Sequence, residues 1–142
     1  AIFWSAIKND TPPLIYEDGR QKRDFIHVKD LVRGKLLLLE DSRSDYGIFN
    51  IGTGRPSSIL DLANVLISLS KKNLAVNVIN KFRSGDIRDC YADITKVSAL
   101  GFVPQLSLSD GLQDLVQWGE RQSAVSKVAL AHQELVKKGL VV

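Results

Sequence analysis

The chain has 142 residues, of which 44% are hydrophobic and 25% charged, a balance typical of a globular protein. Its 19 basic and 16 acidic residues give a formal net charge of +3 without a long block of one sign, which argues against a nucleic-acid module. No apolar run approaches the ~18 residues of a membrane span and no secretion leader is visible, so we expect a cytoplasmic protein without membrane contact.

The chain begins in an unusual way for a complete protein. It contains no Met, even at position 1, and residues 1–8 already carry apolar side chains at helical spacing without an N-cap in front. We therefore expect a fragment of a longer protein or a trimmed product, which begins inside a helix. The single cysteine, Cys90, cannot form an internal disulfide, and we expect it to be a partly buried, inert thiol.

A β-hairpin is predicted near the N-terminus. The β-prone runs Pro13–Tyr16 and Arg23–Val28 flank an Asp18-Gly19 turn signal. Arg23 would emerge at the foot of the second strand, where the apolar residues that follow it would hold its planar fork for bidentate binding of a phosphate or carboxylate. The alternative for Arg23 is a solvated or ion-paired side chain.

The rest of the chain alternates helical and strand patterns and predicts an α/β fold, a partial sheet with flanking helices. Helices are expected at 28–41, from Ser58 with Asp61 as a capping box, at 95–100, from Ser107 or Ser109, and at 123–138. Strands are expected at Ile48–Ile51, which suits burial on both faces, and at Val76–Ile79, with extended structure at Cys90-Tyr91.

A glycine-rich turn and an Arg-Ser-Gly-Asp sequence are the motifs that could bind a ligand. Gly52-x-Gly54 has Ser57 in the third position of a dinucleotide fingerprint and no acid about 20 residues later, so a structural strand-to-helix turn is the better interpretation. Gly85 would let the backbone turn so that Arg83 and Asp86 converge on one ligand, the guanidinium on phosphate and the carboxylate on hydroxyls. A weak ion pair is the alternative.

The remaining polar residues give weaker signals. Arg88 either contributes to the same ligand site as Arg83 or is a solvated side chain, and the second interpretation is favoured. His27 is expected to be a packed or surface histidine, and His132 stands alone in the last predicted helix. Neither histidine has carboxylates or thiols at metal-ligand spacing, so we predict no metal site.

Four motifs together resemble, in order, the C-terminal part of the nucleotide-sugar epimerases and dehydratases of the extended short-chain dehydrogenase/reductase family. They are Pro13-Leu14-Ile15-Tyr16 followed by Arg23-Asp24-Phe25-Ile26-His27-Val28-x-Asp30-Leu31, then Phe49-Asn50-Ile51-Gly52-Thr53-Gly54, then Phe82-Arg83-Ser84-Gly85-Asp86-Ile87-Arg88 with Ala92-Asp93, and Leu100-Gly101-Phe102-x-Pro104. The motifs cover most of residues 1–121, which would form the nucleotide-sugar-binding portion, and leave 122–142 as a C-terminal helical extension.

The resemblance implies roles for four residues. In the family, the residues matching Arg23 and Arg83 bind the diphosphate, the one matching Asp86 binds the ribose, and the one matching Tyr16 lies by the base. The family's NAD fingerprint lies in an N-terminal half that this chain lacks. Its catalytic Tyr-x-x-x-Lys pair is absent as well, because Arg20, Asn50 and Thr95 follow the three tyrosines at that spacing. We therefore expect no catalytic residue and no cofactor in this chain, although NAD serves the full-length family.

Two functions remain open from the sequence. The first is a half-site for a nucleotide-diphosphate sugar without turnover, where the parent enzyme would oxidise the sugar at C4 and later return the hydride. The second is a non-catalytic module that binds a partner or forms a homodimer, because the apolar surfaces of segments 23–40 and 49–51 would need to be covered. The base and sugar of the ligand are not specified.

Overall fold

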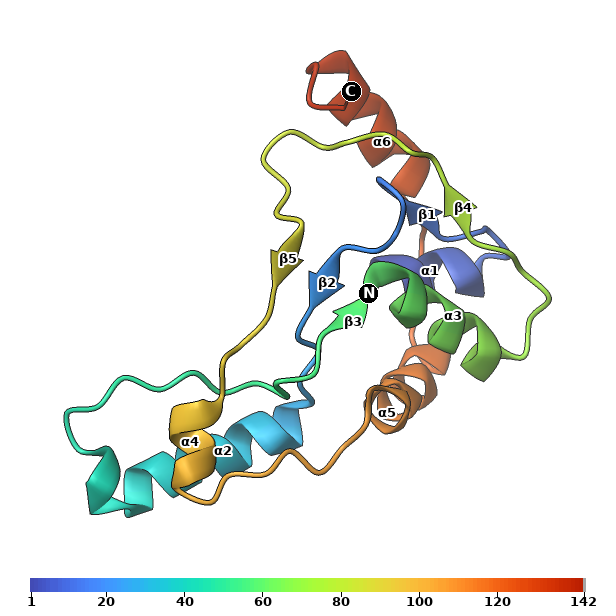
Figure 1. Ribbon diagram of the computed structural model, residues 1–142. Coiled ribbons are helices and arrows are strands. Elements are labelled where there is room, and N and C mark those ends of the chain that lie inside the picture. Colours follow the sequence, from blue (N-terminus) through green and yellow to red (C-terminus); the bar gives the residue numbers. More distant parts are fainter. Residues whose placement is uncertain (142) are drawn as a thin grey trace.

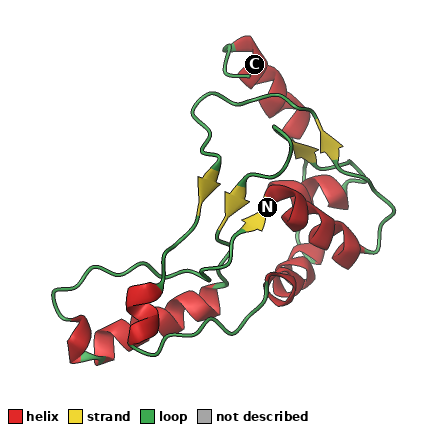
Figure 2. Cartoon of the chain, in the orientation of Figure 1, coloured by secondary structure: helices red, strands yellow, loops and turns green. Residues whose placement is uncertain are grey.

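The computed structural model describes residues 1–141 as a mixed α/β fold, the class expected from the sequence (Figure 1). The helices are α1 (Ile2–Lys8), α2 (Val28–Glu40), the 3-10 helix η1 (Ser42–Ser44), α3 (Ile59–Ser70), α4 (Thr95–Ala99), α5 (Leu108–Glu120) and α6 (Val128–Lys137). The strands are β1 (Leu14–Ile15), β2 (Lys22–Arg23), β3 (Ser57–Ser58), β4 (Asn77–Val78) and β5 (Asp89–Cys90). Long connecting segments separate these short strands (Figure 2).

The main hydrophobic core lies among α1, α3 and α5. Its buried side chains are Trp4, Ile7, Leu66, Leu112 and Val116. Gly119 of α5 permits the close approach of α1, because a Cβ at this position would lie 2.2 Å from the indole Nε1 of Trp4. The three helices therefore pack around one shared core.

The predicted hairpin is wrong, because β1 and β2 do not pair with each other. β1 pairs in parallel with β4, while β2 lies between β3, which is antiparallel to it, and β5, which is parallel. The turn at Gly19 is instead attached to the start of α3, where the amide of Leu60 donates to the Gly19 carbonyl and that of Ile59 to the Gln21 carbonyl. These contacts divert the chain, so that each run finds a partner distant in sequence.

The strand predicted at Ile48–Ile51 is also wrong. This segment has no regular secondary structure, and the Ile48 side chain is 85% exposed. An apolar run becomes a strand only when a neighbouring strand pairs with its amides and carbonyls, and no strand among residues 1–141 does so here.

Most predicted helices are confirmed, and their ends follow local capping chemistry. Ser58 with Asp61 opens α3 and Ser107 with Asp110 opens α5, each as a reciprocal capping box. His27 caps α2, since its Nδ1 accepts from the Lys29 amide. The last helix begins at Val128 rather than Ser123, without a side-chain cap. No helix within residues 1–141 is long and apolar enough to cross a membrane.

Candidate functional site

An open cavity of about 870 Å³ is formed by α1, α3 and α6 together with β1, β2 and the loop that precedes β5. Its lining is mainly apolar, with a few polar and charged groups: Ala1, Ile2, Phe3, Ser5, Leu14, Tyr16, Gln21, Arg23, Ile59, Leu62, Arg83, Asp86, Val125, Lys127, Val128, Ala131, His132 and Leu135. Small-molecule sites have this size and this composition. All four residues that the sequence singled out, Tyr16, Arg23, Arg83 and Asp86, line this one cavity.

Asp86 joins the two arginines of the cavity. Its Oδ1 accepts from Nη2 of Arg23 at 3.1 Å, and its Oδ2 accepts from Nη2 of Arg83 at 2.5 Å. The Asp86 side chain is 18% exposed, so this bridge is partly shielded from water. The ion pair of Arg83 with Asp86, which the sequence analysis gave as an alternative, is therefore present. Arg23 of β2 joins this pair through the second carboxylate oxygen.

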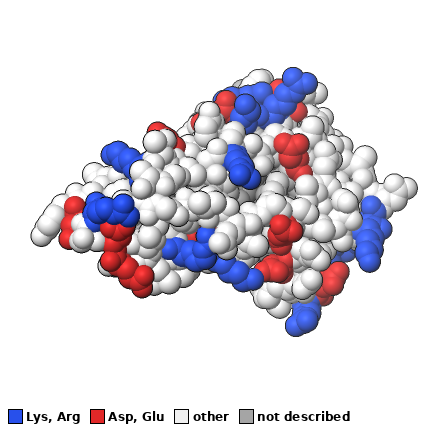
Figure 3. Space-filling model, turned by 60° about the horizontal axis from the view of Figure 1, so that its bottom comes forward, with Lys and Arg blue, Asp and Glu red and all other residues white. Residues whose placement is uncertain are grey.

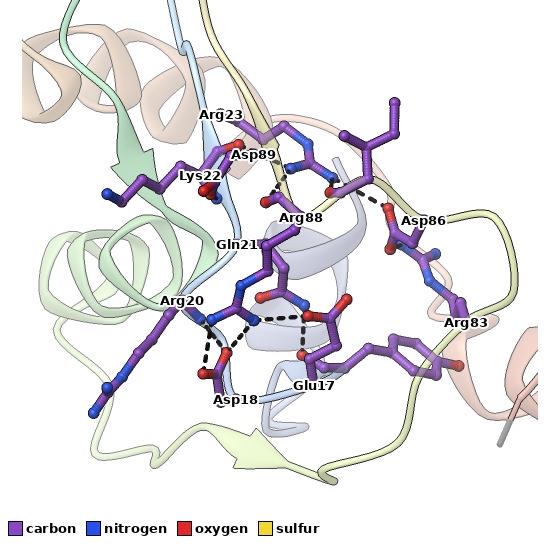
Figure 4. A network of polar contacts seen from close by, with 12 residues as sticks. Glu17, Asp18, Arg20, Gln21, Lys22, Arg23, Arg83, Asp86, Arg88 and Asp89 are labelled. Carbon is purple, nitrogen blue, oxygen red and sulfur yellow. Dashed lines mark hydrogen bonds and ion pairs between the residues drawn. The ribbon is translucent and has the colours of Figure 1, made fainter.

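Backbone carbonyls fix the Arg23 guanidinium. Nη1 donates to the carbonyls of Lys22 and Arg88 at 2.8 and 3.1 Å, and Nη2 donates to that of Ile87 at 2.6 Å (Figure 4). A guanidinium held at several points loses little conformational entropy when an anion binds to it. The cavity wall thus carries a preorganised cation.

Tyr16 stands between an arginine and a histidine. The guanidinium carbon of Arg83 lies 4.8 Å from the centre of the Tyr16 ring, within cation–π range. The Tyr16 hydroxyl is 2.7 Å from Nδ1 of His132 in α6, and the two ring centroids are 5.8 Å apart. The sequence analysis missed His132 as a cavity residue, because no spacing rule connects two side chains that lie 116 residues apart.

The cavity has a positive charge balance. Arg23, Arg83 and Lys127 contribute three cations against the single carboxylate of Asp86, which gives +2 with His132 neutral. Together with donors of fixed geometry, this balance suits an anionic ligand such as a diphosphate. Elsewhere the charges alternate, and on the face in Figure 3 basic and acidic side chains lie interspersed, unlike the continuous basic surface of a nucleic-acid module.

Arg88 is ion-paired outside this cavity, which corrects its assignment to solvent. Its Nη1 donates to Glu17 at 2.7 Å and to Asp18 at 2.6 Å, and Nη2 donates to Asp18 at 2.8 Å (Figure 4). These hydrogen bonds hold the pKa of Asp18 well below its ordinary value and raise the pKa of Arg88. Arg88 therefore fastens the loop before β5 to the turn after β1.

The Gly52–Gly54 turn is organised around the carboxylate of Asp24. This side chain accepts from the Thr53 amide at 2.8 Å, the Thr53 hydroxyl at 2.6 Å, and the amides of Gly54 and Ala92 at 3.2 and 3.3 Å. The amides that would cradle a phosphate in a dinucleotide site are thus already bonded to an anion of the protein. The geometry agrees with a structural turn.

The remaining candidate residues, His27 and Cys90, lie outside the cavity lining. His27, besides capping α2, has its Nε2 3.6 Å from Asp114, whose pKa is lowered mainly by a hydrogen bond from Lys29. Cys90 is exposed rather than partly buried as predicted. Within residues 1–141, no group of three or more His, Cys, Asp or Glu side chains could hold a metal ion.

Comparison with known proteins relates the chain to one family. The sequence model of the NAD dependent epimerase/dehydratase family matches residues 1–52. The chain is 31% identical over 121 residues to a putative UDP-glucose 4-epimerase of Methanocaldococcus jannaschii. This alignment covers 83% of this chain and 37% of that protein.

Solved structures give the same result. A UDP-glucose 4-epimerase of Thermotoga maritima, crystallised with UDP-glucose, matches with a TM-score of 0.75 and 32% identity over 84% of this chain and 38% of that one. A UDP-N-acetylglucosamine 4-epimerase of Methanobrevibacter ruminantium, in complex with UDP-N-acetylmuramic acid, matches with a TM-score of 0.74 and 32% identity over 86% and 39%. The chain therefore spans less than two-fifths of the length of these relatives.

Proposed function

Since this chain belongs to the NAD-dependent epimerase/dehydratase family, we propose that it forms the part of such an enzyme that binds the nucleotide-diphosphate sugar. The observation that carries the proposal is the convergence of Tyr16, Arg23, Arg83 and Asp86 in one cavity of about 870 Å³. These residues come from two segments far apart in the sequence, and the Asp86 carboxylate joins the two arginines.

Each residue has a role that its chemistry supports. Arg83 donates to the diphosphate through the guanidinium hydrogens that its bond to Asp86 does not use. Arg23 contributes mainly its fixed positive charge, because its four Nη hydrogens are donated to Asp86 and to the carbonyls of Lys22, Ile87 and Arg88. Asp86 accepts from the hydroxyls of the ribose, and the ring of Tyr16 lies against the base. Structural relatives contain UDP-glucose and UDP-N-acetylmuramic acid, which makes UDP-sugars the first ligand class to test.

The catalytic part of the reaction is proposed to lie outside this chain. A Tyr-x-x-x-Lys pair does not occur in its sequence, and the Gly52–Gly54 turn does not fit NAD because Asp24 already bonds its amides. We propose that the NAD site and the catalytic pair belong to the portion of the relatives that this chain does not span, and that the chain alone binds the nucleotide sugar without turnover. We also propose a cytoplasmic location, with which the exposed thiol of Cys90 agrees.

Calorimetric titration with UDP, UDP-glucose and dTDP-glucose tests the proposal. Arg23→Ala and Arg83→Ala should each weaken binding by roughly 10- to 150-fold, the loss of about 1.5–3 kcal/mol expected for a hydrogen bond to a charged group. Arg43→Ala is the control, because this guanidinium pairs with Asp41 just beyond α2, away from the cavity. A folded chain that binds none of the three ligands would show that this site does not take nucleotide sugars.

A second candidate function rests on the exposed apolar face of α2. Val28, Val32, Leu36 and Leu39 follow one another at helical spacing and are 48–81% exposed. Contiguous apolar patches of this kind usually mark an interface. The alternative is therefore a non-catalytic module that dimerises or binds a partner protein through α2. Light scattering decides between a monomer and a homodimer, and a monodisperse dimer that binds no nucleotide would favour this alternative.

A further inference from the structure

The turn after β1 is fastened to both ends of segment 80–88, which carries two of the charged residues of the cavity. At the start of the segment, the Glu17 amide donates to the Lys81 carbonyl at 2.9 Å, and the Glu17 carbonyl accepts from the Asn80 amide at 3.2 Å. At its end, the Arg88 guanidinium donates to the Glu17 carboxylate at 2.7 Å. Residues 80–88 therefore form a loop whose base is closed by a single turn.

We propose that Glu17 and Arg88 are positioning residues of the diphosphate site. Neither residue lines the cavity, so neither would contact the ligand. Their ion pair instead keeps the charge of Arg23, and the loop that carries Arg83 and Asp86, in the geometry that binds a diphosphate. The inference rests on the proposed function, since it concerns the affinity of the same site.

Arg88 acts on the cavity through its main chain. Its carbonyl accepts from Nη1 of Arg23 at 3.1 Å and from the Lys22 amide at 3.0 Å. The neighbouring carbonyl of Ile87 accepts from Nη2 of Arg23 at 2.6 Å. Figure 4 shows the Arg88 side chain extending from this place towards Glu17. A shift of Arg88 therefore moves the acceptors that fix the Arg23 guanidinium.

Glu17 is a buried anchor for Arg88. The Glu17 side chain is 7% exposed, whereas that of Arg88 is 48% exposed. A carboxylate shielded from water depends on its cationic partner, because few water molecules can replace the guanidinium. Asp18, at 45% exposure, accepts two further hydrogen bonds from the same guanidinium. The buried contact with Glu17 is therefore the one that fixes the position of Arg88.

Glu17 occupies this place at a conformational cost. Its φ is 53°, in the left-handed region that glycine adopts freely and that a Cβ atom disfavours. Glycine would form the turn with less strain, but it would lack the carboxylate. Residues held in this region persist only where surrounding contacts over-determine them, and they cluster at functional sites. Here the contacts are the ion pair and the two backbone hydrogen bonds of Glu17.

The C-terminus holds the middle of the loop, which limits the effect of losing the ion pair. The Ser84 amide donates to the Leu140 carbonyl at 2.8 Å, and Arg83 forms a β-bridge with Val141. Without the ion pair, the loop would keep these contacts while its end at residue 88 came free. The site would then be competent for only part of the time, and apparent affinity falls in proportion to that fraction. A competent fraction of about 0.1–0.3 corresponds to a loss of roughly three- to tenfold.

The test measures the affinity of the 142-residue chain for inorganic pyrophosphate by calorimetry, under conditions where urea denaturation shows every variant to be folded. Glu17→Gly and Arg88→Ala should each weaken binding by roughly three- to tenfold. Charge alone predicts opposite effects, because the first variant removes a negative charge, which favours an anion, and the second removes a positive one. The double variant should bind no more weakly than the weaker single variant. Arg43→Ala, which breaks an ion pair with Asp41 away from the cavity, should change the affinity by less than about twofold.

NMR of the Arg23 side chain gives a readout that needs no ligand. A guanidinium fixed by four hydrogen bonds rotates slowly about its Cζ–Nη bonds, so its Nη protons should give separate signals in the wild type and merged signals in Glu17→Gly. Separate signals in this variant would overturn the inference.

A pyrophosphate affinity of Glu17→Gly equal to or above that of the wild type would also overturn the inference, while leaving the proposed function intact. If the glycine variant does not fold, Glu17→Asn takes its place, because asparagine tolerates the same φ and carries no charge. A wild type that binds neither UDP nor pyrophosphate would refute the proposed function and this inference together.

Discussion

Replacing Asp86 with Asn should strengthen the binding of inorganic pyrophosphate and reduce the preference of the site for UDP over pyrophosphate. The carboxylate accepts from both Arg23 and Arg83, and its side chain is 18% exposed, so it is the one negative charge that faces an incoming diphosphate. A phosphate that binds these guanidinium groups on their other side would lie about 6 Å from the carboxylate. Coulomb's law gives a repulsion of about 0.7 kcal/mol per charge in water and about 2.8 kcal/mol near a protein surface.

A value near the middle of this range, about 1.4 kcal/mol, corresponds to a tenfold gain in pyrophosphate affinity for Asp86→Asn. UDP should gain less, because in the proposed site the same change replaces a charged acceptor of the ribose hydroxyls with a neutral one, at a cost of about 1 kcal/mol. The UDP-to-pyrophosphate affinity ratio should therefore fall several-fold. Calorimetry at about 0.1 M salt measures both constants, and Asp45→Asn, an exposed acid outside the cavity lining, controls for net charge. Weaker pyrophosphate binding by Asp86→Asn would refute the reasoning, because Asp86 would then matter for orienting the arginines.

Three further changes test the fold. Leu66→Ala in the core should lower the free energy of unfolding by about 2–5 kcal/mol. Leu39→Ala, at a side chain that is 81% exposed, should change this free energy by less than about 0.5 kcal/mol. Urea denaturation compares the two variants, and equal effects would contradict the assigned core. Asp24→Ala removes the acceptor of the partly buried Thr53 donors and of the Gly54 amide and should cost about 1 kcal/mol in the same assay, so an unchanged midpoint would count against the network. Arg88→Ala should raise the pKa of Asp18 towards its ordinary value, which an NMR titration of that carboxyl measures. Because folding lowers this pKa, the stabilisation by the pair is present above about pH 4 and is lost as the pH falls below it, and a stability profile identical in wild type and Arg88→Ala would refute the assignment.

The local elements of the fold could be predicted from the sequence because their causes are local. A capping box needs only two residues three positions apart, and an amphipathic helix needs only its own spacing, so the start of α3 at Ser58 was predicted. The start of α5 was left open between Ser107 and Ser109, and the structure places its capping box at Ser107 and Asp110. The pair of Arg83 and Asp86 belongs to the same class, since both lie in one turn. The sequence could therefore name candidate ligand groups before their surroundings were known.

The strand pairing could not be predicted in this way. The Asp18-Gly19 turn signal is compatible with a hairpin, but contacts between this turn and the start of α3 separate the two runs, and β1 instead finds β4. The segment Ile48–Ile51 has the composition of a buried strand and still forms none, because no neighbouring strand among residues 1–141 pairs with it. A strand is defined by its partner, which its own residues do not specify.

By itself, the sequence determined most of the helices, the capping box of α3 and a set of candidate residues for binding a diphosphate sugar. Only the tertiary structure decided that Arg23 shares Asp86 with Arg83 across 63 residues, and that His132 meets Tyr16 across 116. The physical reason is the range of the interactions. Propensity and capping act within one or two helical turns, whereas a binding cavity is made by packing, which brings together side chains whose separation along the chain carries no information about their distance in space.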